Sequence, residues 1–266
     1  MLRKYGRAPY RAALIHGGPG ARGSLSGVAR RLSLCAGVLE PIQSRCSVSG
    51  LAEELHEQLA PFSDAPLVLL GHSWGAMLSL LHAAQHPDKI RRLILTGCPP
   101  LTPDGTEQIT PRRLARLSSP QADEFRQLLR QLETDAPGQD ARLARLGELA
   151  ERADRYDLLP DDTPDADYLP PDAHAFSAVW PQAAALRRQG AFLRAAELLT
   201  CPVTLIQGEQ DPHPADAVIR AFKQAGKPLE TYLLPRCGHA PFQERYARDA
   251  FFDLVENYIR EAVHPK

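Results

Sequence analysis

The segment Gly71-His72-Ser73-Trp74-Gly75 has the G-x-S-x-G pattern in which a serine hydroxyl can act as a nucleophile. Four apolar residues, 67–70, precede it, and residues 76–86, which contain few helix breakers, follow it. This order predicts a buried strand, a tight turn and a helix, with the Ser73 hydroxyl held clear of a sheet. Because G-x-S-x-G also occurs by chance, an ordinary serine in a glycine-containing loop is the alternative interpretation.

Asp211 and His239 are the residues that could activate Ser73. Asp211 follows the apolar segment 201–207, and His239 follows the segment 229–234. The carboxyl ends of parallel strands share one edge of a sheet, so we expect Ser73, Asp211 and His239 to meet there. His239 would remove the serine proton and return it to the leaving group. Asp211 would orient the imidazole and stabilise its protonated form.

Other acidic and histidine side chains lie close to these positions in the sequence. Glu209 lies two residues before Asp211, but the break between strand and loop favours Asp211 as the acidic partner. His72 is expected to pack beside the serine turn, and His213 is close enough to Asp211 to contact the site. Glu244 is expected to hold the histidine loop rather than to take part in the reaction.

A second turn, His16-Gly-Gly-Pro-Gly20, follows the apolar strand predicted at residues 11–16. Its glycines lack G-x-G-x-x-G and G-x-x-x-x-G-K-[ST] spacing, which argues against phosphate binding. It fits instead a loop that donates a backbone N–H to the oxyanion formed when a serine attacks a carbonyl group. Proline has no N–H, so Gly18 is the expected donor and Gly17 the alternative, with Trp74 supplying the second N–H. His16 is expected to shape this loop by hydrogen bonding. Four residues could line the substrate pocket: His16, Gly17, His72 and His213.

The elements that would position these residues alternate between strands and helices. Strands are predicted at 11–16, 37–43, 67–70, 91–97, 201–207 and 229–234. Helices are predicted at 24–34, 48–62, 76–86, 215–225 and 249–263. This alternation is typical of an α/β fold with a parallel sheet and right-handed crossovers.

The composition changes at about residue 101, where arginine, alanine, leucine, aspartate and proline become frequent. Helices are predicted at 121–133, 142–156 and 173–190, with an irregular segment at 160–172 and a new turn at Pro181. An all-helical insertion between two strands of a parallel sheet predicts a cap over the carboxyl ends of the strands. We therefore expect a core of residues 1–100 and 191–266 and a helical cap of residues 101–190.

The overall composition excludes several classes of function. The 266-residue chain has a formal net charge of −1 at pH 7, which does not suggest nucleic acid as a partner. No apolar run approaches the roughly 20 residues of a membrane helix, and the N-terminal residues lack the apolar core of a secretory signal, so a cytoplasmic location is expected. The five cysteines include no CxxC pair, which predicts free thiols and no metal site.

The chain order Ser73, Asp211, His239 resembles that of the α/β-hydrolase superfamily. More narrowly, His16-Gly-Gly-Pro-Gly20 together with Gly71-His-Ser-Trp-Gly75 resembles the proline iminopeptidase-like branch, over residues 11–100 and 200–263. The resemblance implies an eight-stranded sheet with a helical cap after the sixth strand. Only about ten residues precede the first predicted strand, too few for the usual first two. We therefore expect a mostly parallel sheet of about six strands, with the strand at 11–16 near one edge.

The residues and the resemblance together predict a cofactor-free serine hydrolase that cleaves a small ester or amide through an acyl-enzyme on Ser73. The first alternative is a prolyl aminopeptidase, which would hold the free amine of its substrate with cap glutamates. Glu133, Glu148 and Glu151 cannot be aligned with that role. The second alternative is a protein that binds a ligand without turnover. The expected partner is a small molecule or short peptide, not nucleic acid or a membrane, and the expected state is a monomer or homodimer.

Overall fold

The computed structural model describes residues 1–62, 64–132, 138–159, 169 and 172–263. Its strands form one seven-stranded sheet in the order β1-β3-β2-β4-β5-β6-β7. They are β1 (Leu2–Tyr5), β2 (Tyr10–Ile15), β3 (Gly37–Pro41), β4 (Leu67–His72), β5 (Ile90–Thr96), β6 (Val203–Gly208) and β7 (Glu230–Leu234). All neighbouring strands are parallel except β1 and β3. The predicted α/β fold with a mostly parallel sheet is confirmed.

The edge strand β1 is an element that the sequence analysis did not anticipate. It pairs antiparallel with β3, with Leu2 opposite Pro41 and Tyr5 opposite Val38. Its sequence, Leu-Arg-Lys-Tyr, is too short and too charged for its hydrophobic pattern to predict a strand. The sheet consequently has one strand more than the six expected. The strand expected near one edge, β2, has both β3 and β1 between it and that edge.

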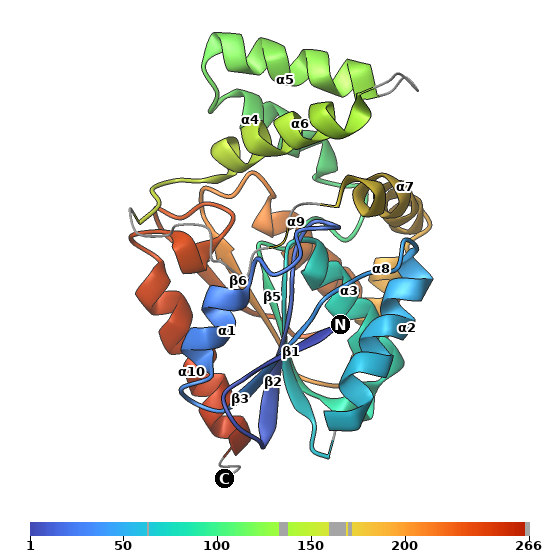
Figure 1. Ribbon diagram of the computed structural model, residues 1–266, viewed down its shortest axis with the longest axis vertical. Coiled ribbons are helices and arrows are strands. Elements are labelled where there is room, and N and C mark those ends of the chain that lie inside the picture. The colour runs from blue at the N-terminus through green and yellow to red at the C-terminus, as the bar shows by residue number, and fades with distance from the viewer. Residues whose placement is uncertain (63, 133–137, 160–168, 170–171, 264–266) are drawn as a thin grey trace.

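Helices cover both faces of the sheet (Figure 1). On one face lie α1 (Ser26–Leu32) and α10 (Arg248–Val263), and on the other lie α2 (Val48–Leu59), α3 (Trp74–Gln85), α8 (Ala191–Leu198) and α9 (Ala215–Gln224). Side chains along β4 alternate between the two layers, so that Leu67 and Leu69 pack with α2 and α3, whereas Val68 and Leu70 pack with α1 and α10. Burial on both faces explains why the sequence of β4 is a continuous apolar run.

The segment between β5 and β6 contains α4 (Ile109–Leu114), α5 (Ser119–Leu132), α6 (Gln139–Asp154) and α7 (Ala173–Arg188). Helices α4 to α6 lie together at one end of the molecule (Figure 1), and α5 and α6 share a small apolar cluster of their own. In contrast, α7 packs Val179 and Ala183 into the core beside α2 and α3. No helix among the described residues is long and apolar enough to cross a membrane.

Two expectations for this segment have different outcomes. Pro181 lies inside the helix α7 and does not start a new turn. Its fixed φ fits helical backbone, and the helix continues although proline has no N–H to donate at this position. The irregular segment predicted at 160–172 lies almost entirely outside the described residues.

Gly75, in the first turn of α3, lies directly against the backbone of β2. A Cβ atom at this position would collide with the carbonyl oxygens of Ile15 and His16, which are backbone atoms of a buried strand and cannot move aside. We expect Gly75→Ala to lower the free energy of unfolding by about 3 kcal/mol through overpacking. Gly147→Ala, in α6, is the matched control, because nothing lies within 4 Å of the added methyl group. It should raise stability by about 0.5–1 kcal/mol. Urea unfolding of both variants tests this, and equal effects would contradict it.

Candidate active site

Ser73 occupies the turn between β4 and α3, as predicted, with a φ of 56°. Positive φ is uncommon for a residue other than glycine, so this backbone conformation is maintained by its surroundings. The Ser73 N–H donates to the carbonyl oxygen of Thr96 at 2.9 Å, which ties the turn to the end of β5. A Cβ atom on Gly17 would lie 3.3 Å from the Ser73 Cβ, so the His16–Gly20 loop lies against the serine.

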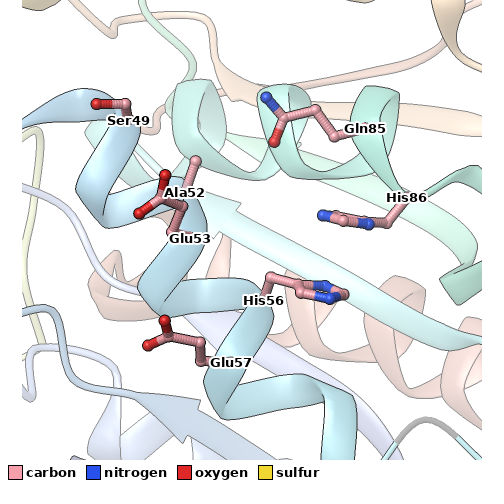
Figure 2. A pocket seen from close by; sticks show the side chains of 7 residues that line it. All are labelled: Ser49, Ala52, Glu53, His56, Glu57, Gln85 and His86. Carbon is pink, nitrogen blue, oxygen red and sulfur yellow. The ribbon is translucent and has the colours of Figure 1, made fainter.

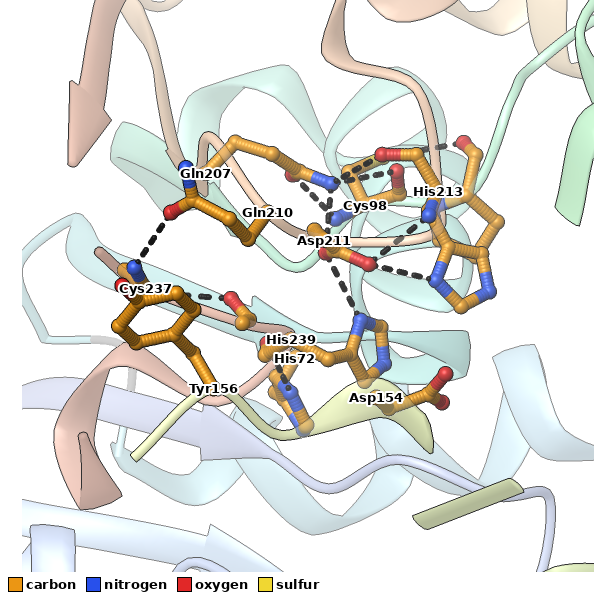
Figure 3. Close-up of polar contacts among 12 residues, drawn as sticks. His72, Cys98, Asp154, Tyr156, Gln207, Gln210, Asp211, His213, Cys237 and His239 are labelled. Atoms are coloured by element: carbon orange, nitrogen blue, oxygen red, sulfur yellow. Dashed lines mark hydrogen bonds and ion pairs between the residues drawn. The ribbon is translucent and has the colours of Figure 1, made fainter. Parts of the chain in front are cut away.

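Asp211 and His239 follow β6 and β7, and their side chains form a direct hydrogen bond (Figure 3). The His239 Nδ1–H donates to Asp211 Oδ2 at 2.9 Å. A Cβ atom on Gly97, which follows Thr96, would lie 3.0 Å from both Cε1 and Nδ1 of His239. The imidazole therefore lies over the end of β5, to which the Ser73 turn is also bound. The structure thus brings the three residues to one edge of the sheet.

Asp211 is only 2% exposed, and donors surround its carboxylate. Besides His239, the His213 N–H and the His213 Nδ1–H each donate to Oδ1 at 2.9 Å. The Gln207 Nε2–H donates to Oδ2 at 2.8 Å. Gln207 was missed by the sequence analysis, although an amide side chain at the end of a buried apolar strand is a signal that could have identified it. Its Oε1 also accepts from the Cys98 N–H at 2.8 Å, which joins β6 to the end of β5.

These contacts set the charges of Asp211, His239 and His213. Burial would raise the pKa of Asp211, but His239 and His213, through charge and hydrogen bonds, lower it well below its usual range. Burial would lower the pKa of His239, but the negative charge and hydrogen bond of Asp211 raise it above its ordinary value. Burial and the neighbouring His239 lower the pKa of His213. Because the two imidazoles stack with centroids 4.4 Å apart, only one of them readily carries a proton, and the environment favours His239.

His72 and His16 make structural hydrogen bonds. The His72 Nε2–H donates to the His239 carbonyl oxygen at 3.1 Å, so this ring packs beside the turn and supports the histidine loop. His16 is fully buried, and burial lowers its pKa to about 4. Its Nδ1–H donates to the Gly17 carbonyl oxygen at 2.9 Å, and its Nε2 accepts from the Gln43 N–H at 3.3 Å. Both ring nitrogens are therefore committed to shaping the loop.

Gln43 joins the His16–Gly20 loop to Trp74 and was not singled out from the sequence. Its Oε1 accepts from the Trp74 indole N–H at 3.0 Å, and its Nε2–H donates to the His16 carbonyl oxygen at 3.3 Å. One buried side chain therefore links Trp74, an expected oxyanion donor, to His16 at the start of the loop that carries the other expected donor. Gly17 is buried, whereas Gly18 is partly exposed with a φ of 111°, a conformation that glycine adopts readily.

Glu244 holds the histidine loop, as expected, and it also binds the end of α6. This fully buried carboxylate accepts the N–H groups of Gly238 at 3.1 Å, Tyr156 at 2.8 Å and Asp157 at 2.6 Å. The His239 N–H in turn donates to the Asp154 carbonyl oxygen at 2.8 Å. The C-terminal end of α6 is thus bound directly to the loop that carries His239.

The remaining acidic candidates lie away from these contacts. Glu209 is exposed, so Asp211 and not Glu209 meets His239. Glu148 pairs with Arg145, and Glu151 pairs with Arg155, in exposed positions on α6. Glu133 lies outside the described residues.

One group at this site has the composition of a metal site. Side-chain ligand atoms of Asp154, His213 and His239 lie within 4.8 Å of one another. However, Arg113 already binds both oxygens of Asp154, at 2.7 and 2.6 Å. The group therefore has a protein cation in place, and its arrangement fits a site that needs no metal.

Comparison with known proteins places the chain within a broad group. A family model described as alpha/beta hydrolase fold matches residues 14–246. No curated protein matches the chain in sequence.

Three solved structures with a similar fold are distant from this chain in sequence. VinJ has a TM-score of 0.70 at 18% identity, over 98% of this chain and 94% of that one. A haloalkane dehalogenase loop variant, DbeA-M1, from Bradyrhizobium elkanii has a TM-score of 0.70 at 17% identity, over 98% and 93%. A putative lipase, lip1, from Acinetobacter baumannii AYE has a TM-score of 0.64 at 19% identity, over 100% and 88%. At these identities the similarity shows the fold alone.

Proposed function

Because this chain belongs to the alpha/beta hydrolase fold family, we propose that it is a serine hydrolase that cleaves small esters or amides through an acyl-enzyme on Ser73. The observation that carries the proposal is that two features lie at the same edge of the sheet. Ser73 is held at positive φ in a strand–helix turn, and His239 is hydrogen-bonded to the buried carboxylate of Asp211. A serine nucleophile, a base and an orienting carboxylate are the parts that acyl transfer requires.

In the acylation step, the His239 Nε2 removes the proton of the Ser73 hydroxyl as Oγ attacks the substrate carbonyl carbon. Asp211 accepts a hydrogen bond from the His239 Nδ1–H throughout, which leaves the Nε2 lone pair available for the serine proton. The protonated imidazole then gives the proton to the leaving oxygen or nitrogen, and the bond to the leaving group breaks. Water, deprotonated by His239, hydrolyses the acyl-enzyme in the same way and restores Ser73.

The negative charge on the carbonyl oxygen would be stabilised by the N–H groups of Trp74 and of Gly18, with Gly17 as the alternative donor. Two observations support this assignment. Trp74 is the residue after the nucleophile at the start of α3, and the glycine loop lies against Ser73.

We propose that residues 101–190 act as a cap that limits the size of the substrate. The contacts of α6 with the His239 loop support this, because that helix could not move far without disturbing the base. Within the same chemistry, removal of an N-terminal proline is the second candidate. The combination of His16-Gly-Gly-Pro-Gly20 with Gly71-His-Ser-Trp-Gly75 favours it, whereas the exposed ion pairs of Glu148 and Glu151 do not.

Labelling with a fluorophosphonate, followed by mass mapping of the adduct, tests the proposal. We expect modification at Ser73 in the wild-type protein and its loss in His239→Ala, because the serine is then no longer activated. Hydrolysis of short-chain esters and of prolyl amides then separates the two candidates. Folded protein that is not labelled at Ser73 would contradict a hydrolase and favour a protein that only binds its ligand.

The pH dependence of turnover follows from the raised pKa of His239. The base must be neutral to accept a proton, so kcat/KM should rise with pH and reach half its maximum above about pH 6.5, the ordinary value for histidine. Asp211→Asn removes the negative charge that raises this pKa, so its midpoint should lie at lower pH than that of the wild type. A pH–rate series with one ester substrate checks both points. A rate that does not change between about pH 5 and pH 8 would contradict them.

A further inference from the structure

Three histidines come together between α2 and the C-terminal end of α3, away from Ser73. His56 lies on α2, His82 lies on α3, and His86 caps the C-terminal end of α3. Ligand atoms of the three side chains lie within 4.8 Å of one another. Ser73 precedes the 12-residue helix α3 and His86 follows it, so these two residues are about 20 Å apart along its axis.

The cluster opens into a surface pocket of about 320 Å³ lined by residues of both helices. His56 and His86 line this pocket, and Figure 2 shows their imidazoles one above the other, stacked with centroids 3.8 Å apart and ring planes 11° apart. The third ring, His82, has centroid distances of 6.0 Å to His56 and 4.8 Å to His86. The His82–His86 pair has the i, i+4 spacing that places two side chains on one face of a helix.

The buried His82 ring also points to a ligand at this cluster. It is only 1% exposed, and among the described residues no group hydrogen-bonds to its Nδ1 atom. Buried polar atoms normally have a partner, because leaving one unsatisfied costs free energy. A cation held among the three rings is a partner that this arrangement could provide.

The electrostatic surroundings keep His82 and His86 uncharged and available as ligands. Burial, with smaller contributions from His86 and His56, lowers the pKa of His82 to about 3. Burial and His56 also lower the pKa of His86. Neutral imidazoles are the form that binds metals, and the carboxylates of Glu53 and Glu57 at the pocket rim add negative charge. Both carboxylates form ion pairs with Arg45, so they act on the site through their charge and not as ligands.

We propose that His56, His82 and His86 form a binding site for a divalent transition-metal ion such as Zn²⁺. Three imidazole nitrogens would coordinate the ion and a water molecule from the pocket would complete a tetrahedron. A Zn–N distance of about 2.0 Å requires ligand nitrogens about 3.3 Å apart. The lone pairs of the stacked His56 and His86 rings lie in nearly parallel planes, so these rings must rotate out of the stack to meet one ion. Both residues are only partly buried, which allows that rotation toward the fixed His82. The bound ion would link α2 to the end of α3.

Zinc titration calorimetry on the untagged chain tests this site. The wild-type protein should bind one Zn²⁺ per chain at the cluster, and its Tm should rise with the zinc concentration. His56→Gln and His86→Gln change the two partly exposed ligands and leave the buried His82 in place. Each should weaken zinc binding at least about 100-fold, since loss of a second-shell partner alone costs about 10- to 100-fold. His174→Gln, at an exposed position on α7, is the control and should bind zinc as the wild type does.

His213→Gln distinguishes this cluster from the one around Asp154, and it should leave the zinc affinity unchanged. Circular dichroism without zinc shows whether each variant is folded. Failure of the folded wild type to bind Zn²⁺ would overturn the proposal. So would undiminished binding in the folded His56→Gln/His86→Gln double variant, or loss of binding in His213→Gln. Because none of these results depends on turnover, they stand apart from the proposed hydrolase activity.

Discussion

Replacement of Ser73 by alanine is expected to lower kcat/KM for an ester substrate by about 10⁶-fold, because the nucleophile is removed while the fold is kept. His239→Ala should cost a similar factor, since the hydroxyl is then not deprotonated. The two residues act as a unit, so the double variant should be no less active than either single variant. Asp211→Asn should reduce kcat by about 10⁴-fold, because the amide cannot hold the imidazole in the required tautomer.

The matched control for Ser73→Ala is Ser79→Ala, six residues further along the chain in α3. The Ser79 hydroxyl is buried, and among the described residues nothing hydrogen-bonds to it, so its removal should leave kcat/KM unchanged. Initial rates at low substrate concentration measure all the variants. Equal activity of Ser73→Ala and wild type would exclude the acyl-enzyme mechanism. Multiplicative losses in the Ser73→Ala/His239→Ala double variant would show that the two residues act separately.

The second large effect is expected at Glu244, whose replacement should cost stability as well as activity. Glu244→Ala leaves the N–H groups of Gly238, Tyr156 and Asp157 without their acceptor in a fully buried place. Each unsatisfied buried group costs about 1–3 kcal/mol, and water partly relieves this cost. We therefore expect the free energy of unfolding to fall by about 3–5 kcal/mol. In a domain of this size that lowers Tm by roughly 10 °C.

The His239 loop loses its anchor in the same variant, so kcat/KM should fall even well below the Tm. Glu244→Gln keeps one acceptor oxygen but turns an NH₂ group toward backbone N–H donors, so its stability should lie between those of the wild type and Glu244→Ala. Glu148→Ala, an exposed position in an ion pair on α6, is the control and should change neither property. Calorimetric scans with parallel rate measurements test this. A Tm for Glu244→Ala within about 2 °C of the wild type would contradict it.

The parts of the fold and site that depend on local pattern could be predicted from the amino-acid sequence. An apolar run followed by G-x-S-x-G and a helix-forming segment identified the Ser73 turn, because those residue types restrict the backbone over a few positions. Asp211 and His239 could be predicted to approach Ser73 because parallel strands present their carboxyl ends at a common edge. The strands and helices of the core were likewise visible as short buried runs and amphipathic periods.

The groups that support these residues became apparent only from the folded arrangement of the chain. Gln43 and Gln207 are ordinary polar residues in the sequence, and each acts through a partner on another element of the fold. Glu244 could be expected to hold the histidine loop, but its bonds to Tyr156 and Asp157 after α6 could not. The same holds for the cluster of His56 with His82 and His86, which exists because α2 packs against α3. The edge strand β1 was missed because its few charged residues become a strand only by pairing with β3. Contacts between distant segments arise from packing of the whole chain, and no local spacing encodes them.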